Sequence, residues 1–260
     1  MNEARQSAVS GEKSYSIRTL SVGMRLFETV LSADKDWGIT ELAVAVGLSK
    51  HQIFRHLHTL CDNGFLQQDE QTGRFSIGLR SYQMLQSISS KEWLMQAARR
   101  EMVRLRDQSG KTVTLTKPIP GPKILVLHVE PGPNPLQYAL HTGAILDTHA
   151  SAHGKVALAF SDQIILDQVF DLIPTKYTNL TVTDQVQLRD EIEMVRKRGW
   201  AVAPGETALG MNALAVPIIT NGVFRGSIGY FGPLEVVPPA PDLKDVEALQ
   251  DASKRIAVWG

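Results

Sequence analysis

The sequence of residues 38–78 is GITELAVAVGLSKHQIFRHLHTLCDNGFLQQDEQTGRFSIG. Its first part, Thr40–Gly47, has the pattern of a short helix with Thr40 as the N-cap and a glycine at the C-terminal end. A second helix follows directly, because Ser49 and Gln52 are spaced to form a capping box. Gly64 would supply the left-handed residue that ends this helix. We therefore expect two short helices joined by a tight turn.

Elements on both sides of this pair complete a larger pattern. An amphipathic helix is expected over Ile17–Leu31, with Ser16 as its N-cap and an apolar stripe of Leu20, Met24, Phe27 and Leu31. After the pair, Leu66–Asp69 and Arg74–Gly78 alternate as two strands of a hairpin that turns at Gly73. Three helices followed by a hairpin are typical of a winged helix-turn-helix, which points to DNA.

The second helix of the pair has a face suited to a DNA groove. Its buried stripe would consist of Ile53, Leu57 and Leu60. His51, Arg55 and His58 recur at helical spacing on another face. No acidic residue occurs between positions 42 and 61, and phosphates and acceptor-rich base edges favour such a face. A solvated helix surface is the alternative, and it is the simpler interpretation of the helix taken alone.

The candidate DNA contacts come from this helix and from the hairpin. They are Ser49, Lys50, His51, Gln52, Arg55, His56, His58 and Arg74. The face of His51, Arg55 and His58 would read bases, while Lys50 and Arg74 would contact phosphates and position the protein. An arginine beside a turn is also often a solvated residue, and Arg74 keeps that alternative.

Three histidines in one helix raise the alternative of a zinc site. His51 and His58 share a face but lie two turns apart, and His56 diverges from them. They cannot converge on one ion without ligands from elsewhere. Cys61 is expected to be a small buried residue. The sequence therefore predicts neither a metal site nor a cofactor.

Composition limits the class of protein. The chain has 260 residues, a formal net charge of zero and one cysteine. This length suits two unequal domains, and the balanced charge means that any DNA affinity must come from a local arrangement of charges. A single cysteine, without an apolar secretory segment or a bilayer-spanning run, indicates a cytoplasmic protein.

The domain boundaries are expected where the hydrophobic pattern changes. The predicted parts are a disordered N-terminus (1–15), the winged helix-turn-helix (16–78), a helical connector (79–90) and a second domain (91–260). The apolar stripe of the connector is Leu79, Tyr82, Leu85 and Ile88. A capping box at Ser89–Glu92 would start a new helix, from about Ser90 to Gln108. A stiff connector of this kind can transmit a movement, which a flexible tether cannot.

Beyond Gly110 the chain alternates between strand-like and helical patterns. Strands are expected near Thr112–Pro118, Lys123–Glu130, Leu136–Leu140, Trp200–Ala203, Ala213–Ile219 and Val223–Tyr230, the last two joined by a turn at Asn221-Gly222. Helices are expected over about Gly154–Phe160, Ser161–Phe170, Thr183–Arg198 and Leu243–Val258. A sheet with helices outside it indicates an α/β or α+β domain.

Several strings occur in an order that is specific to one family. They are SIRTLSVGMRLFETVL, GLSKHQIFRHLHTLCDNGFL and GRFSIGLR, then HTGAILDTHASAHGKVALAF, RKRGWAVAPGE and GMNALAVPIITNGVFRGSIGYFGP. From about Ser16 onward the chain resembles transcriptional regulators of the IclR family. The resemblance implies an α+β protein with a winged helix-turn-helix, a helical linker and a GAF-like effector-binding domain. It also implies that a dimer or tetramer binds double-stranded operator DNA.

The resemblance further implies where a small effector binds. The pocket would lie at the backbone amides of Ala152 and His153 before Gly154, with a far wall of Ala203, Ala213, Gly229 and Phe231. Members that hold small carboxylates have Asp, Cys and Ser at such positions, whereas this chain has apolar residues or glycine. We therefore expect glyoxylate-like acids to bind weakly and a larger or more aromatic ligand to be preferred. Its polar contact would come from Tyr138, His141, His149 or His153.

Alternatives remain for the pocket and for the class of protein. One alternative is that the resemblance is misaligned by one residue at the pocket, and another is that the pocket is vestigial. Lys155 after Gly154 does not form a phosphate loop, because the GxxxxGK[ST] spacing is absent, and Glu206 and Gly210 are assigned to loop structure. An enzyme with an accessory domain would need a motif such as GxSxG, HExxH or CxxC, and none occurs. A protein-interaction module that has lost DNA binding is the other alternative.

The mechanism expected from a stiff connector and the family resemblance is a population shift. An effector would favour one placement of two recognition helices in a dimer, and so change operator affinity. Whether transcription then falls or rises does not follow from the residues.

Overall fold

The structure is a computed structural model that describes residues 17–33, 35–84, 92–133, 140–161, 169–170 and 174–260. The chain divides into two compact units, residues 1–88 and 89–260, and each is described by itself. Within the described ranges, no helix is long and apolar enough to cross a membrane.

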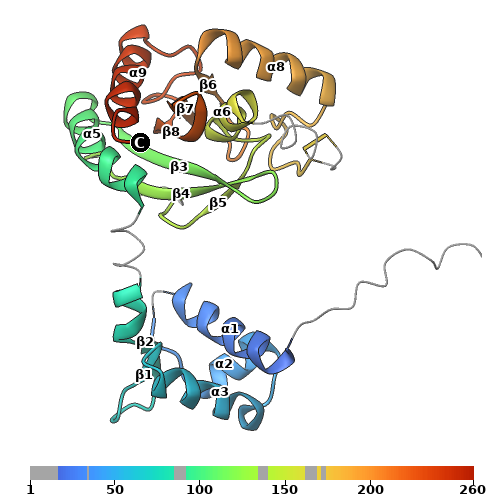
Figure 1. Ribbon diagram of the computed structural model, residues 1–260. Coiled ribbons are helices and arrows are strands. Elements are labelled where there is room, and N and C mark those ends of the chain that lie inside the picture. Colours follow the sequence, from blue (N-terminus) through green and yellow to red (C-terminus); the bar gives the residue numbers. More distant parts are fainter. Residues whose placement is uncertain (1–16, 34, 85–91, 134–139, 162–168, 171–173) are drawn as a thin grey trace, which may run out of the picture. The chain divides into compact units, whose positions relative to one another are not determined.

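The first unit combines helices with a short hairpin (Figure 1). Its elements are α1 (Arg18–Leu31), α2 (Ile39–Val46), α3 (Lys50–Asp62), β1 (Leu66–Gln68) and β2 (Phe75–Ile77). The two strands pair antiparallel, and Gly73 lies between them with φ +67°. Trp37, just before α2, also pairs with Phe75 of β2, so the hairpin is anchored to the helices. The arrangement confirms the predicted winged helix-turn-helix.

Both ends of α3 form as the sequence predicts. The Ser49 hydroxyl accepts a hydrogen bond from the Gln52 N–H at 3.3 Å, and the Gln52 side-chain oxygen accepts one from the Ser49 N–H at 2.9 Å. At the other end, the Phe65 N–H donates to the Leu60 carbonyl at 2.9 Å across Gly64, which has φ +73°. These are the capping box and the Schellman ending, so α3 has a defined start and stop.

The N-terminal caps of the other two helices differ from the prediction. Gly38 is the N-cap of α2, and the Glu41 carboxylate accepts the Gly38 N–H at 3.4 Å. Thr40 therefore lies inside the first turn and is not the cap. The Glu41 carboxylate at the third helical position lies near the positive end of the helix dipole, where a negative charge is favourable. Ile17 is the N-cap of α1, and Ser16 lies outside the described residues.

The core of the first unit uses a different face of α1 from the apolar stripe that marks this helix in the sequence. Leu26 and Val30 are buried against α2 and α3, whereas Leu20, Met24 and Leu31 are 62%, 48% and 57% exposed. Apolar residues recur at helical spacing on both faces of α1. The apolar recurrence of Leu20, Met24 and Leu31 therefore located the helix correctly, but periodicity alone does not show which of two apolar faces is covered.

The second unit is built on one antiparallel sheet. Its strands are β3 (Thr112–Ile119), β4 (Lys123–Glu130), β5 (Ile145–Asp147), β6 (Ala201–Val202), β7 (Met211–Thr220) and β8 (Val223–Pro233). They lie in the order β5-β4-β3-β8-β7-β6, and all neighbours are antiparallel. The helices are α5 (Trp93–Ser109), α6 (Ala152–Phe160), α8 (Gln185–Arg198) and α9 (Leu243–Ala257).

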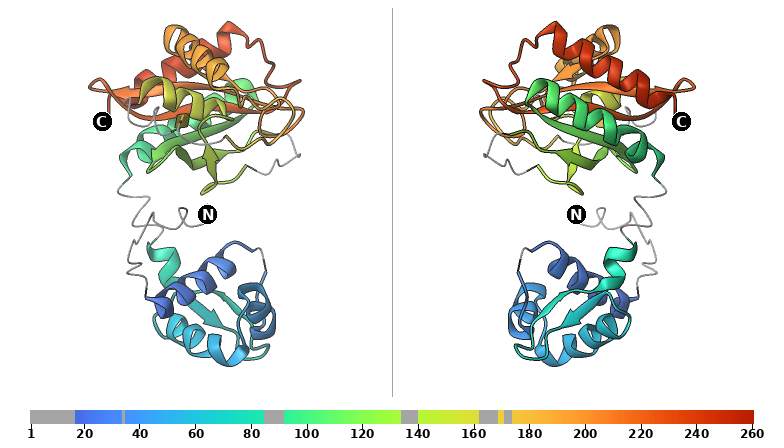
Figure 2. Two further views of the ribbon diagram at one scale, coloured as in Figure 1. Left: turned by 90° about the vertical axis from the view of Figure 1, so that its right-hand side faces the viewer. Right: turned by 90° about the vertical axis from the view of Figure 1, so that its left-hand side faces the viewer.

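Helices cover both faces of this sheet. In the right-hand view of Figure 2, α5 and α9 lie side by side over one face, where Met102 and Leu249 meet Val216 of the sheet. On the other face, α6 and α8 pack around a second core that contains Val156 and Ile192. The layered α/β architecture confirms the predicted class.

Most predicted elements of the second unit are present, with shifted ends. The helix expected from about Ser90 begins as α5 at Trp93, with Glu92 as its N-cap, and the Glu92 carboxylate pairs with Lys117. The Asn221-Gly222 turn has φ values of +52° and +76°, as a two-residue hairpin of this type requires. The three-residue strand β5 is not among the predicted strands. Several predicted features lie wholly or mostly outside the described residues: Leu85, Ile88, Ser89, the strand at 136–140 and the helix at 161–170.

Candidate functional site

The outer face of α3 carries exposed basic side chains. Lys50, His51, Arg55 and His58 are all exposed. Among the described residues, no hydrogen bond or ion pair engages the side chains of Lys50, His51 or Arg55. Exposed cations without carboxylate partners, on a helix whose one acidic residue is Asp62 at its C-terminal end, are available to an external anion.

Three of the predicted contacts on α3 have roles within the unit. The side-chain oxygens of Ser49 and Gln52 are bound to each other and to the backbone at the start of the helix. His56 is half-buried, and a Cβ built on Gly23 of α1 would lie 4.0 Å from His56 Nδ1. His56 therefore lies on the side of α3 that meets α1, and its predicted DNA contact stays a prediction.

Sequence reasoning missed Phe54 on the same helix. This side chain is 51% exposed, and its ring lies 4.3 Å from the ring of His58, measured between centroids. An aromatic one position after the buried Ile53 looks like part of the core stripe. The signal that could have distinguished Phe54 from the core stripe is its four-residue spacing from His58, which places both rings on one face of the helix.

Arg74 of the hairpin is engaged within the first unit. Its guanidinium donates to the Asp36 carbonyl at 2.8 Å and to the Glu41 carboxylate at 3.0 Å. The hydrogen bond from Arg74 holds the pKa of Glu41 below its usual value. Arg74 thus ties the hairpin to the start of α2, and its predicted role as a phosphate contact of the wing stays a prediction. Because Glu41 lies far from it in sequence, the pairing has no local signal.

The second unit contains a cavity of about 340 Å³ between α6 and the sheet. It is lined by Thr114, Leu140, Ala144, Leu146, Ser151, Ala152, His153, Ala203, Thr207, Ala208, Met211, Asn212, Ala213 and Phe231. The predicted pocket residues Ala152, His153, Ala203, Ala213 and Phe231 therefore line one cavity. Tyr138 lies outside the described residues.

His153 forms part of the cavity wall as a neutral ring. Its Nε2 lies 2.7 Å from Thr114 Oγ1, and its Nδ1 lies 2.8 Å from Ser227 Oγ and 3.3 Å from Thr116 Oγ1. Complete burial lowers the pKa of His153 to about 3, so the imidazole is uncharged near neutral pH. Both ring nitrogens already have hydrogen-bond partners in the protein. His153 therefore lines the cavity without offering a free nitrogen to a ligand.

The cavity is less apolar than the sequence suggests, but most of its polar groups are occupied. The Ser151 hydroxyl caps α6 by accepting the Gly154 N–H at 3.1 Å, and it donates to the Asp147 carbonyl. The Asn212 amide bonds the Ala203 N–H and the Val237 carbonyl. The expectation of a pocket with no hydroxyl was therefore wrong. Thr207 is exposed and has no hydrogen bond among the described residues.

Other predicted pocket residues support the cavity from outside it. A Cβ on Gly154 would lie 2.3 Å from the Thr148 carbonyl oxygen, and one on Gly229 would lie 2.2 Å from that of Leu214. Both glycines therefore permit close backbone packing and do not line the cavity. His149 is buried, and its Nε2 lies 2.9 Å from the Thr175 carbonyl oxygen. His141 is exposed and does not line the cavity either.

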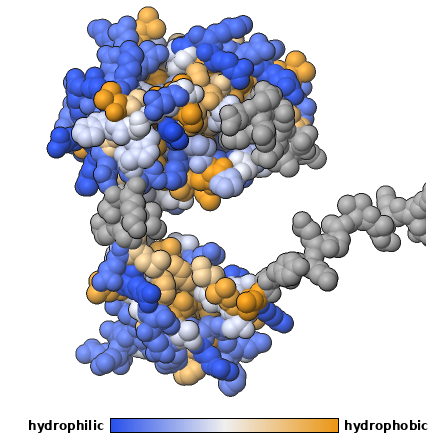
Figure 3. Space-filling view, in the orientation of Figure 1, coloured by the Kyte–Doolittle hydropathy of each residue, from blue (hydrophilic) through white to orange (hydrophobic). Residues whose placement is uncertain are grey.

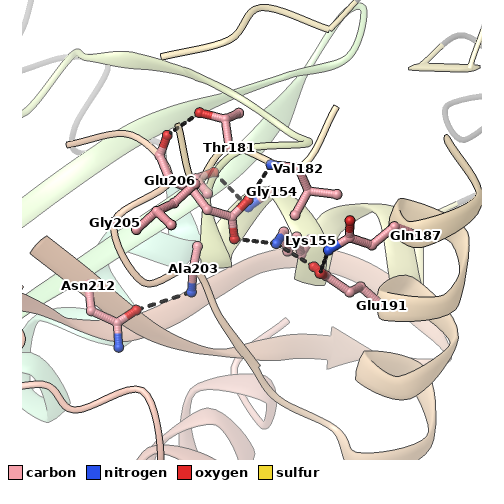
Figure 4. Close-up of polar contacts among 12 residues, drawn as sticks. Gly154, Lys155, Thr181, Val182, Gln187, Glu191, Ala203, Gly205, Glu206 and Asn212 are labelled. Atoms are coloured by element: carbon pink, nitrogen blue, oxygen red, sulfur yellow. Dashed lines mark hydrogen bonds and ion pairs between the residues drawn. The ribbon is translucent and has the colours of Figure 1, made fainter. Parts of the chain in front are cut away.

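A buried ion pair fixes the loop that forms one wall of the cavity. Lys155 of α6 bonds the carboxylates of Glu206 and Glu191 (Figure 4), and the side chains of Lys155 and Glu206 are only 2% and 4% exposed. Glu206 also accepts the Val182 N–H at 3.3 Å. Burial raises the pKa of Glu206, while the charge and hydrogen bond of Lys155 oppose that rise. Lys155 is thus a buried structural cation, bound to the residue that precedes Thr207 in the chain.

Known protein families match both the helix-turn-helix of the first unit and the α/β domain of the second. A family model described as "IclR helix-turn-helix domain" matches residues 19–70, and "Bacterial transcriptional regulator IclR C-terminal" matches residues 86–225. The "Glycerol operon regulatory protein" of Streptomyces griseus is 26% identical over 93% of this chain and 95% of its own length. The "Transcriptional repressor IclR" of Escherichia coli K12 is 27% identical over 78% and 74%.

Solved structures share the fold at lower identity. An IclR homologue from Microbacterium hydrocarbonoxydans, complexed with 4-hydroxybenzoate, has a TM-score of 0.81 and 21% identity, covering 92% of this chain and 98% of its own. The Thermotoga maritima IclR has a TM-score of 0.80 and 20% identity, covering 92% and 97%.

Proposed function

The chain belongs to the IclR family of DNA-binding transcriptional regulators, and on that premise we propose that it binds operator DNA through α3 and responds to a small organic ligand in the cavity of its second unit. Relatives from Escherichia coli and Salmonella typhimurium are named repressors, which supports a repressor here as well. The relatives carry regulatory names, which agrees with the prediction that the chain is not an enzyme.

The observation that carries the proposal is the outer face of α3. Lys50, His51 and Arg55 stand exposed on the second helix of a helix-turn-helix, without a carboxylate partner among the described residues. The recognition helix of this fold enters the major groove with such side chains directed at bases and phosphates. We assign Arg55 and His51 to base contact and Lys50 to phosphate contact.

The cavity supports an aromatic ligand that carries an acidic group. Leu140, Leu146, Met211 and Phe231 give it apolar walls, and its volume of about 340 Å³ lies in the range of small-molecule pockets. The first N–H groups of α6, at Ala152, lie in the same wall, and helix N-termini favour anions. A glyoxylate-sized acid would leave most of these walls uncovered. An acid such as 4-hydroxybenzoate, which one solved relative contains, would cover them.

An apolar face on α1 supports a dimer. Ile17, Leu20, Met24 and Leu31 are between 48% and 67% exposed and recur on one side of the helix. Figure 3 shows hydrophobic surface gathered over α1 in the first unit. Exposed apolar patches of this kind mark protein–protein contacts. We propose that two copies pair here, which would present two copies of α3 to two operator half-sites.

The test of DNA binding is an affinity measurement across salt concentration. The purified protein is titrated onto DNA from upstream of its own gene and onto a scrambled sequence of equal length and composition. Selective binding is expected, with log Kobs falling linearly with log salt by about 0.9 for each phosphate contact. A failure to bind either DNA at low salt would favour a protein-interaction module instead.

The test of ligand binding is a thermal-shift panel of small acids and aromatic acids. Benzoate-type acids are expected to raise the melting temperature more than glyoxylate or pyruvate, because they bury more of the cavity wall. A larger shift with glyoxylate or pyruvate would refute the assigned ligand class.

A further inference from the structure

An exposed aromatic side chain lies on the face of α3 assigned to DNA. Phe54 is 51% exposed and does not belong to the core that contains Ile53. A single exposed apolar residue is common and by itself needs no explanation. Phe54 is distinguished by its neighbours, because it precedes Arg55 directly and lies three residues after His51 and four before His58.

The contact with His58 restricts the ring of Phe54. The two ring centroids lie 4.3 Å apart, and the ring planes are tilted by 52°. A ring held against a neighbour loses less rotamer freedom when it binds than an unrestrained one. Phe54 therefore presents an oriented apolar surface on the face of α3 that it shares with His51 and His58.

A major groove offers few partners for such a surface. Its base edges are hydrogen-bond donors and acceptors, with one apolar group, the 5-methyl of thymine. An aromatic ring placed against any other base edge would desolvate polar atoms without compensation. Building on the proposed function, we propose that Phe54 contacts a thymine methyl in the operator and contributes to sequence selectivity, with His58 as the positioning residue for its ring.

The test removes the methyl group alone. After footprinting locates the operator on the upstream DNA, each thymine is replaced in turn by deoxyuridine, which lacks only the 5-methyl. At one or more positions the wild-type protein should lose about fourfold in affinity, the equivalent of about 0.8 kcal/mol for one buried methyl.

Variants assign the effect to Phe54. Phe54→Ala and Phe54→Gln should bind the thymine and deoxyuridine operators equally at that position, and circular dichroism checks that each variant is folded. Gln is included because it keeps length and helix propensity while removing the apolar ring. Val44→Ala is the matched control, since Val44 is an apolar residue of α2 that is 79% exposed, and it should retain the discrimination.

The outcomes separate this proposal from the one on which it rests. If the wild-type protein binds every deoxyuridine operator as tightly as the thymine operator, or if both Phe54 variants keep the discrimination, Phe54 does not read a methyl group, although selective DNA binding still stands. If the wild-type protein shows no selective DNA binding at all, the proposed function itself fails.

Discussion

Removal of the Lys155 charge should expose how much the buried ion pair contributes to the cavity. In Lys155→Met, the carboxylate of Glu206 loses its main cationic partner while its side chain stays 4% exposed. Leaving one member of a buried pair without its partner costs about 3–5 kcal/mol. For a domain of this size, each kcal/mol lowers the melting temperature by about 2–4 °C, so the expected decrease is about 6–20 °C.

The decrease in melting temperature of Lys155→Met should depend on pH in a defined direction. Burial already raises the pKa of Glu206 above its usual value, and Lys155 opposes that rise. Without Lys155 the folded-state pKa of Glu206 rises further above its unfolded value, so the folded variant binds the proton more tightly than the unfolded chain does. The decrease in melting temperature of Lys155→Met should therefore be largest near neutral pH. It should become smaller as the pH falls through the raised pKa of Glu206.

Thermal unfolding followed across pH measures this effect, with two controls. The double variant Lys155→Met/Glu206→Gln has no carboxylate at position 206, so its melting temperature should vary less with pH than that of Lys155→Met. Lys254→Met removes an exposed pair with Asp251 and should leave the melting temperature unchanged. A deficit that is the same at every pH, or that the double variant retains in full, would refute the reasoning.

Three further perturbations test other parts of the molecule. Arg74→Ala should destabilise the first unit in thermal unfolding yet leave the salt slope of DNA binding unchanged, whereas loss of a phosphate contact would lower that slope by about 1. Met24→Glu places a charge in the exposed face of α1 and should weaken self-association in sedimentation experiments; an unchanged dimer would exclude that face. Ala213→Leu should fill the cavity and abolish the thermal shift by 4-hydroxybenzoate, while DNA affinity without ligand stays as in the wild type.

Features encoded by neighbouring residues could be predicted from the sequence. The capping box at Ser49 and the left-handed turn at Gly64 depend on residues within a few positions of one another, and both ends of α3 formed as expected. The turn at Asn221-Gly222 formed for the same reason. Local hydrogen bonding and backbone conformation therefore located α3 without knowledge of the fold.

Features that depend on distant contacts could not be predicted in this way. The guanidinium of Arg74 pairs with Glu41 rather than with solvent, because β2 lies beside the start of α2. In α1 only the packing of the helices decided that Leu26, and not Met24, faces the core. In the cavity, the family resemblance supplied Ala213 of the distant wall, but the neighbouring Asn212 and Thr114 of β3 join the lining only through the packing of the sheet against α6.

The most direct test of the account compares operator binding by the wild-type protein, Arg55→Ala and Arg99→Ala. Arg55 and Arg99 are both exposed arginines on helices, but only Arg55 lies on α3. Loss of a base contact costs about 1–3 kcal/mol, so Arg55→Ala should weaken operator binding by about 5- to 150-fold. Arg99→Ala should bind as the wild type does. Operator binding by Arg55→Ala that is as tight and as selective as that of the wild-type protein would contradict the assignment of α3 as the helix that reads DNA.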